Sequence, residues 1–559
     1  MSIYLTIDTC RRHRAPGGSR IRATHGCVFH GVARLFRSGA FYILGAALCA
    51  SLIPGAALPE QAGAAPLFLS AGRMPGGDLS RILDDLSGRR ADIAPMQREL
   101  VARPAVGPEY GGAGEEEKAR WIERWLTERG LAYERLDFPD ARVASRVRPN
   151  IVVVYPDHGP DHGPNHGQAH EPEPGPDQGA EQGTGQRPGP GAGRVRGAAK
   201  TPALWLLSHL DVAEAGPREL WQGDPFALRV DGDTMYGRGV EDNNQAIAVS
   251  LLLLDSLRRT KVEQPLRLGL VFTSGALTGY DCGIGYVVDK RPDLFGPEDL
   301  IVVMDYGNAE GSLVGVGEKG NLWLKITVAG KSGHAGRPDA ANNAFAAGAA
   351  LAHGLARTLN GQGTDFPIEN ALFAPPGVTV TPTRVEDYST GVNHIPEKFI
   401  FYADARVTPD YSFADAEKAV RGLADAVERE NGVSIGIERV EETPPARVTP
   451  EDAPVLAALG RAIRAELGVE PRHTGTGSVT MASVLRNKGL NVAVWGVQET
   501  MHNRPGEHAR ISAHIKQTRV LARMLFDMPS KAGEVKGSAG ASGNAGPGQV
   551  DGPADGARK

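Results

Sequence analysis

Four short apolar runs constrain the fold of this chain more than any other feature, and they occupy residues 204–207, 268–272, 300–304 and 492–495. Each run has the length and composition of a buried β-strand. Segments with helical patterns, such as 245–258 and 481–488, lie between the runs, and the pattern over 78–100 predicts one further helix before them. Strands that alternate with helices predict an α/β fold in which a mostly parallel sheet is flanked by helices.

The residues after the first run point to a metal site. His209 and Asp211 follow it directly in an H-x-D arrangement, and Asp242 heads the apolar helix further along. Ligands of parallel sheets gather beyond the carboxyl ends of the strands. Histidine and carboxylate side chains at such ends are suited to a divalent metal such as zinc. An H-x-D pair alone is weak evidence for a metal site, because such a pair occurs by chance in polar loops. The residues that follow the other three runs therefore determine how far the pair supports a metal site.

The ends of the other runs carry further candidates. Asp305 follows the third run directly, and His502 lies a few residues after the fourth. The second run leads instead to Ala276 and Leu277, which cannot bind a metal through their side chains. Three of the four ends therefore carry a candidate ligand, which chance does not easily explain.

The amino-acid composition limits which residues can bind a metal and which partners are expected. The chain has 559 residues and four cysteines, of which Cys10, Cys27 and Cys49 lie near the N-terminus and leave Cys282 alone. Neither a disulfide framework nor a cysteine zinc site is then available, so histidine and carboxylates must hold any metal. The net charge of −5 is close to balance and argues against a nucleic-acid partner.

Residues 1–65 are predicted to be a targeting segment. Basic residues come first, residues 41–57 are apolar, and Ala62-Gly63-Ala64 offers an A-x-A-like cleavage site. This order resembles a secretory signal with a long basic region, so we expect export to the periplasm or the extracellular space. An uncleaved membrane anchor and a misassigned start are the alternatives.

The remaining chain is predicted to form a discontinuous catalytic-type domain with an insert. Residues 66–320 and 441–528 supply the α/β part. Alternating apolar residues mark an inserted α+β domain over 321–440. Residues 157–200, rich in His, Pro and Gly, and the tail 529–559 cannot bury a core, so both are predicted to be disordered.

Several motifs now identify a family resemblance. They are SHLDV at 208–212, YGRGVEDNNQ at 236–245, GKSGHAGRP at 330–338, VNHIP at 392–396, DARVTP at 404–409 and ETMHNRPGEH at 499–508. In this order they resemble the dizinc aminoacylase and carboxypeptidase family, which includes succinyl-diaminopimelate desuccinylase, acetylornithine deacetylase, glutamate carboxypeptidase and dipeptidases. The resemblance implies a zinc-peptidase-like fold with an inserted lid and dimerisation domain. It also implies a homodimer that hydrolyses an amide next to a carboxylate, in a small peptide or an N-acyl amino acid.

The resemblance implies a role for each matched residue of the metal site. His209, Asp242 and Asp305 would bind one zinc ion. Asp242 would bridge to a second ion, which His502 would also bind. Asp211 would support His209 without touching the metal itself.

Three residues of the insert would act on the substrate. The resemblance makes His334 the lid histidine that polarises the scissile carbonyl, often across a dimer. Asn393 and Arg406 would hold the substrate carboxylate, for which a planar guanidinium is well suited. The alternative for all three residues is a structural role in the insert.

The chain departs from the family at residues 275–277. Family members carry two consecutive glutamates here, the first a general base and the second a ligand of the second metal, whereas this chain has Ala276 and Leu277. Loss of a general base typically costs about a hundred- to ten-thousand-fold in rate. Asp242 and His502 alone are too few ligands for a stable zinc site. We therefore expect one zinc ion and a doubtful second site.

Three hypotheses about function follow. The favoured one is a degenerate family member that binds one metal or none and keeps a ligand-binding role, because two adjacent key positions are lost. The second is an active single-metal hydrolase with an unrecognised base, because the other site residues are retained. The third is a metal-binding or interaction protein whose working part is the His-rich segment 157–200.

Overall fold

The computed structural model describes residues 75–156, 201–277, 279–359, 366–386, 391–501 and 503–527. The predicted targeting segment, the His-rich segment, the tail and His502 lie outside these ranges. The chain divides into residues Met1–Ala71 and Gly72–Lys559, and all described residues belong to the second unit. None of the helices in the described ranges is long and apolar enough to span a membrane.

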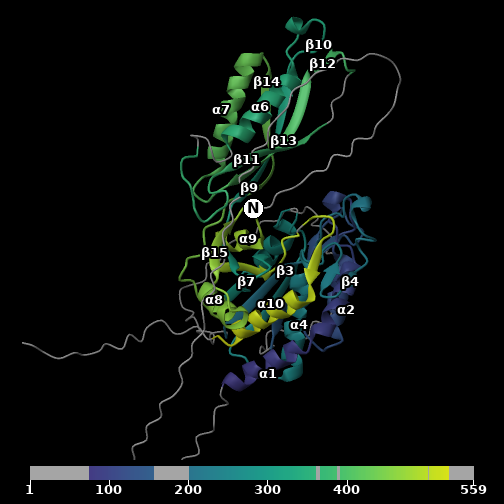
Figure 1. The fold of residues 1–559 in the computed structure, drawn as a ribbon, viewed down its shortest axis with the longest axis vertical. Helices are drawn as coiled ribbons and strands as arrows, with labels where there is room; N and C mark the ends of the chain where they lie inside the picture. The colour runs from purple at the N-terminus through teal and green to yellow at the C-terminus, as the bar shows by residue number, and fades with distance from the viewer. Residues whose placement is uncertain are drawn as a thin grey trace, which may run out of the picture. The chain divides into compact units, whose positions relative to one another are not determined.

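The second unit is built around an eight-stranded sheet (Figure 1). Its strands, in spatial order, are β1 (Glu134–Pro139), β2 (Val147–Tyr155), β6 (Arg267–Thr273), β3 (Ala203–His209), β7 (Leu300–Asn308), β16 (Val492–Val497), β8 (Leu313–Glu318) and β15 (Arg472–Thr476). The four predicted apolar runs are the adjacent strands β6, β3, β7 and β16, and each neighbouring pair is parallel. Their carboxyl ends therefore meet at one edge of the sheet, where the sequence predicts the site.

Helices cover both faces of this sheet, which explains why its central strands are apolar throughout. Every residue of β3 is buried, and its side chains alternate between two cores. Leu204 and Leu206 pack with helices α1 (Pro75–Ser87), α2 (Arg90–Val101), α3 (Glu116–Thr127), α4 (Asn244–Thr260), α8 (Pro454–Leu467) and α10 (Ile511–Leu525). Trp205 and Leu207 pack with α5 (Tyr286–Lys290) and α9 (Met481–Asn487). The predicted mostly parallel sheet flanked by helices is confirmed.

A separate antiparallel sheet follows in the chain. Its strands, in spatial order, are β11 (Thr379–Val385), β13 (Lys398–Val407), β9 (Gly320–Ala329) and β14 (Ser434–Thr443). Helices α6 (Ala344–Thr358) and α7 (Phe413–Asn431) share a hydrophobic core with the inward residues of these strands. Strands β10 (Gly333–His334) and β12 (His394–Ile395) form a separate two-stranded antiparallel sheet. Helix α7 begins at a capping box formed by Ser412 and Asp415 and ends at Gly432, which has a left-handed φ of 62°. The local sequence therefore specifies both ends of this helix.

A fourth sheet, of three strands, consists of β17 (His508–Arg510), β5 (Thr234–Tyr236) and β4 (Arg229–Asp231). It pairs the segment before Asp242 with the segment after His502, although about 270 residues separate them in the sequence. The family motifs at both places are thereby brought to the same region of the fold.

Two sequence expectations differ from the structure. The pattern over 78–100 predicts one helix, whereas α1 ends at Ser87 and α2 starts at Arg90. At the break Arg89 is buried, with its guanidinium 2.8 Å from Asp255 Oδ2. A helical sequence pattern cannot predict an ion pair between residues so far apart in the chain. Asp305 was expected just after a strand but lies within β7.

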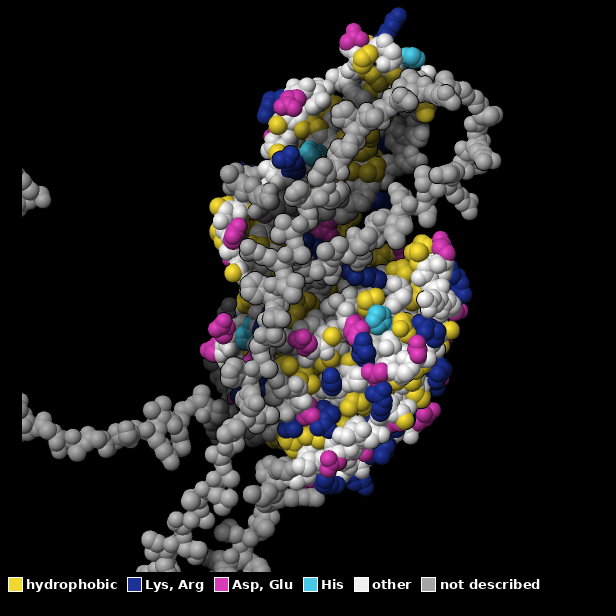
Figure 2. All heavy atoms as spheres, viewed as in Figure 1, with side chains coloured by type: hydrophobic (Ala, Val, Ile, Leu, Met, Phe, Trp, Pro, Cys, Tyr) yellow, Lys and Arg dark blue, Asp and Glu magenta, His cyan; other side chains and the backbone are white. Residues whose placement is uncertain are grey.

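Charged side chains of both signs are interspersed over the described part of the face in Figure 2. Charged residues of the described ranges also form short-range pairs, such as Arg103 with Glu99. A surface of this kind matches the near-balanced composition.

Candidate metal centre

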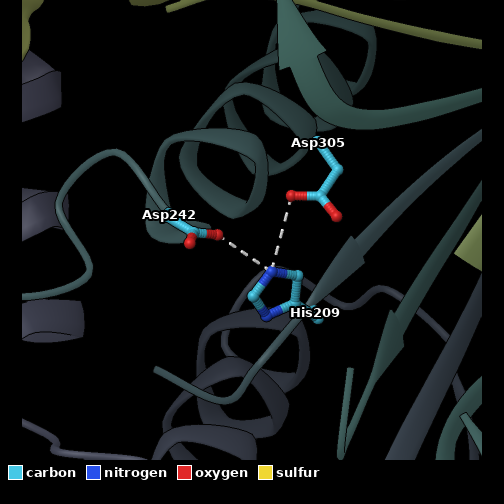
Figure 3. Close-up of side chains that lie close together, drawn as sticks. All are labelled: His209, Asp242 and Asp305. Carbon is cyan, nitrogen blue, oxygen red and sulfur yellow. Dashed lines mark hydrogen bonds and ion pairs between the residues drawn. The ribbon is translucent and has the colours of Figure 1, made fainter. Parts of the chain in front are cut away.

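Three predicted ligands come together at the carboxyl end of the parallel strands. His209 is the last residue of β3, Asp242 lies in the turn before α4, and Asp305 lies on β7. His209 Nε2 is 3.1 Å from Asp242 Oδ1 and 3.6 Å from Asp305 Oδ1 (Figure 3). One ligand atom of each residue lies within 4.8 Å of the other two. The three side chains converge on one point from three separate elements.

The spacing of these atoms suits a small divalent cation. Zinc–nitrogen and zinc–oxygen bonds measure about 2.0–2.2 Å, so two atoms of a tetrahedral site lie about 3.3–3.6 Å apart. The separations of 3.1 and 3.6 Å are close to that range. One histidine and two carboxylates also match the usual number of protein ligands in a catalytic zinc site, which leaves a fourth position for water or substrate.

The protonation of His209 is set by its neighbours. Its Nδ1 lies 2.9 Å from the Asp211 backbone oxygen and 3.2 Å from Asp211 Oδ1, so Nδ1 carries a hydrogen and Nε2 faces Asp242 and Asp305. Burial alone would lower the pKa of His209, but these three carboxylates outweigh it and hold that pKa well above its usual range. The negative charge that favours a proton on Nε2 also favours a metal ion there.

The turn at 275–277 contacts this centre through its backbone. Asp211 Oδ1 accepts a hydrogen bond of 3.1 Å from the Ala276 N–H, and Oδ2 accepts one of 2.9 Å from the Leu277 N–H. Gly275 begins the turn with a φ of +68°, and a Cβ atom there would collide with Cys282 Sγ, so only glycine fits. The two positions where the sequence predicts missing carboxylates therefore adjoin the residue that supports His209.

A nearby carboxylate is already engaged. Glu115 Oε1 accepts a hydrogen bond of 3.3 Å from the Gly275 N–H, but both oxygens of Glu115 are held by the buried guanidinium of Arg148. Burial raises the pKa of Glu115 in spite of this pairing, but Arg148 already occupies both of its carboxylate oxygens.

Comparison with known proteins identifies the family. A sequence profile described as peptidase family M20/M25/M40 matches residues 205–527, which is more than half of the chain. The chain belongs to this family. The resemblance drawn from the motifs is thereby confirmed.

Individual relatives agree with this assignment. The M20 chain is 29% identical over 449 residues to an uncharacterized metallohydrolase of Methanococcus maripaludis, covering 77% of this chain and 97% of the relative. It is 25% identical over 322 residues to the succinyl-diaminopimelate desuccinylase of Roseobacter denitrificans, covering 57% of this chain and 81% of the relative. Its fold is similar to that of human carnosine dipeptidase 1, with a TM-score of 0.60 and 16% identity over 80% of this chain and 98% of the other.

The remaining predicted site residues of the M20 chain lie on the inserted strands. His334 on β10 and Asn393 beside β12 adjoin each other, with His334 Nε2 3.5 Å from Asn393 Nδ2, and both are exposed. Arg406 on β13 donates to both carboxylate oxygens of Asp404, at 2.7 and 2.8 Å, and its Nη1 donates to the Gly477 carbonyl oxygen at 3.3 Å. Arg406 is therefore paired rather than offered freely to a ligand.

Sequence reasoning missed two residues that hold the centre in place. Asn243 accepts from the His209 N–H at 3.2 Å and donates to the Met304 carbonyl oxygen at 2.8 Å, so it joins β3 to β7. Lys118 is fully buried and donates at 2.8 Å both to the Leu210 carbonyl oxygen and to Asn244 Oδ1. Burial lowers the pKa of Lys118 to about 8. Asn243 could have been singled out by its place beside Asp242, whereas nothing local distinguishes a buried lysine on an amphipathic helix.

Proposed function

We propose that this M20 protein binds one zinc ion through His209, Asp242 and Asp305 and recognises an amide next to a carboxylate, with little or no hydrolysis. The observation that carries the proposal is the pair of hydrogen bonds from the Ala276 and Leu277 N–H groups to Asp211. These bonds support the assignment of the two positions to the centre, where neither side chain could accept a proton or bind a metal.

The chemistry follows from the side chains that remain. A bound zinc ion would supply Lewis acidity towards a carbonyl oxygen or water. Asp211 orients His209 for that role through its contact with Nδ1. No carboxylate stands at 276 to receive the proton of an attacking water, which is expected to cost about a hundred- to ten-thousand-fold in rate. His334, Asn393 and Arg406 would position the amide and its carboxylate.

A second candidate function is an active single-metal hydrolase with an unrecognised base. What supports it is the completeness of the first metal site, including the orientation of His209 by Asp211. A third is metal capture by the His-rich segment 157–200, which its histidine content supports.

Three further features belong to the proposal. Export is supported by the apolar segment 41–57 and the A-x-A-like site that follows it. A homodimer joined through the insert, and a small peptide or N-acyl amino acid as the ligand, are supported by the family resemblance.

Metal content and turnover test the proposal together. Zinc per chain is measured by elemental analysis in the mature protein, in a variant without residues 157–200 and in His209→Ala, alongside a screen of dipeptides and N-acyl amino acids. The proposal expects one tight zinc ion that is lost in His209→Ala but kept in the deletion, with ligand binding and negligible turnover. Turnover that disappears in His209→Ala would favour the single-metal hydrolase. Several weak ions lost on deletion would favour the His-rich segment.

A further inference from the structure

Two buried glutamates connect the segments that carry Asp242 and His502. Glu507 and Glu241 have no solvent-exposed surface. Each comes from one segment and binds backbone N–H groups of the other. The contacts therefore run in both directions between residues 238–242 and residues 499–507.

Glu507 binds the turn that carries Asp242. Its Oε2 accepts from Arg238 Nη1 at 2.7 Å and from the Gly239 N–H at 2.9 Å. Its Oε1 accepts from the Glu241 N–H at 3.0 Å and from the Asp242 N–H at 3.1 Å. Four donors, one of them a guanidinium, surround the carboxylate, so the metal ligand Asp242 is held at its own backbone nitrogen.

Glu241 binds the turn that leads to His502. Its Oε2 accepts from the Glu499 N–H and its Oε1 from the Met501 N–H, both at 3.1 Å. Thr500, between these two donors, has a φ of 60°, a left-handed conformation that a β-branched residue rarely adopts. Two converging N–H groups around one carboxylate offset the cost of that conformation.

The backbone aligns the same two segments. Strands β5 and β17 pair antiparallel, with Tyr236 opposite His508, and the Gly237 N–H donates to the Glu507 carbonyl oxygen at 3.1 Å. The two carboxylates continue this pairing beyond the strands, where the backbones no longer form a ladder. Side chains thus replace sheet hydrogen bonds where the chain must turn to present ligands.

We propose that Glu241 and Glu507 are positioning residues that form a reciprocal carboxylate clasp and set the zinc affinity of the centre. Glu507 fixes the backbone of Asp242. Glu241 anchors residues 499 and 501 of the segment from which Glu507 reaches that backbone, so it acts on Asp242 through Glu507. The proposal rests on the proposed function in one respect, namely that the His209 centre takes a metal. It adds the residues through which the 499–507 segment controls that centre.

A purely structural role is the competing explanation, since any buried carboxylate that loses its donors destabilises a fold. Glu466 separates the two explanations. It has only 7% of its side chain exposed and binds Arg519 and Arg523, yet it lies on α8, outside the two clasped segments. Glu466→Gln thus removes the charge of a largely covered, arginine-bound carboxylate and leaves the clasp intact.

The test measures zinc affinity of the metal-free full chain by competition with a chromophoric chelator in Glu241→Gln, Glu507→Gln and Glu466→Gln. Removing a residue that orients a metal ligand typically costs about 10- to 100-fold in affinity. We expect that loss in the first two variants and less than about twofold in Glu466→Gln. Amide exchange should rise at Glu499 and Met501 in Glu241→Gln, and at Gly239, Glu241 and Asp242 in Glu507→Gln.

Thr500→Gly supplies a rescue that a merely structural role would not. Glycine adopts a positive φ at no steric cost, so this change should restore part of the zinc affinity of Glu241→Gln. If Glu507→Gln fails to fold, the zinc affinity of Glu241→Gln with and without Thr500→Gly still distinguishes the clasp from a purely structural role. Folded clasp variants with wild-type affinity, or an equal loss in Glu466→Gln, would overturn the clasp. If the wild type binds no zinc, both the proposed function and the effect of the clasp on zinc affinity are wrong. If the wild type binds zinc but amide hydrogen exchange is unchanged in the variants, only the clasp is wrong.

Discussion

The carboxylate of Asp211 accepts a hydrogen bond of 2.9 Å from the backbone N–H of Leu277. The same carboxylate lies 3.2 Å from His209 Nδ1. One side chain therefore joins the 275–277 turn to His209, a predicted ligand of the candidate metal centre. A substitution in the 275–277 turn should therefore alter the environment of His209, and a substitution at His209 should alter that turn.

Asp211→Asn tests that connection. The amide keeps one acceptor oxygen but loses the negative charge beside His209, and its NH₂ group cannot accept from the Ala276 or Leu277 N–H. We expect zinc affinity to fall by about 10- to 100-fold, measured by chelator competition. Asp231→Asn, an exposed change on β4, should have no effect. Wild-type affinity in Asp211→Asn would show that Asp211 does not support the ligand.

Introducing two glutamates at positions 276 and 277 tests where the site lies. Because the backbone of 276–277 is bound to Asp211, Ala276→Glu with Leu277→Glu places two carboxylates next to the centre. We expect a second zinc ion per chain and a rise of about a hundred- to ten-thousand-fold in hydrolysis of a bound amide. The pair Ala276→Gln and Leu277→Gln, similar in size but uncharged, should gain neither. If a folded glutamate variant gains neither metal nor activity, the site has been placed wrongly.

The sequence predicts the parts of this centre that follow local rules. Buried parallel strands have continuous apolar sequences, so β6, β3, β7 and β16 could be located in advance, and with them the candidate ligands His209 on β3 and Asp305 on β7. Lys118 and Glu507 could not, because each acts on backbone groups far away in the sequence, 92 residues in the case of Lys118 and Leu210. An amphipathic pattern marks which face of a helix is buried but not which polar group a buried lysine will meet. The break between α1 and α2 escaped prediction for the same reason.

The pairing of Arg406 with Asp404 leads to a prediction about ligand binding. A ligand carboxylate would have to compete with Asp404, which already accepts from Arg406 Nε and Nη2. Asp404→Asn should weaken that pairing and strengthen binding of an N-acyl amino acid by roughly tenfold, equivalent to about 1.4 kcal/mol. Isothermal titration with the acid and with its C-terminal amide provides the measurement. An equal gain for the amide would mean that Arg406 does not bind the carboxylate.

His514 on α10 forms part of a buried network that tolerates only the neutral ring. Its Nδ1 lies 2.8 Å from the Arg510 carbonyl oxygen, so Nδ1 carries the hydrogen and Nε2 accepts from Gln97 Nε2 at 2.9 Å. The other hydrogen of that Gln97 nitrogen is directed to the Val240 carbonyl oxygen at 2.9 Å, two residues before Asp242. A second proton on His514 would face a donor instead of an acceptor. Burial accordingly lowers the pKa of His514 to about 4.

This shift predicts acid sensitivity of the fold. Between pH 6.5 and 4 the unfolded chain binds a proton at His514 that the folded chain does not, so the free energy of unfolding falls as the pH is lowered through this window. From pH 7 to pH 5 the loss from this group is about 2 kcal/mol. Denaturant unfolding at both pH values should show a smaller difference in His514→Gln than in the wild type, even if the variant is less stable at pH 7. His353→Gln, at an exposed position on α6, should keep the full difference. An unchanged difference in His514→Gln would mean that other groups cause the acid sensitivity.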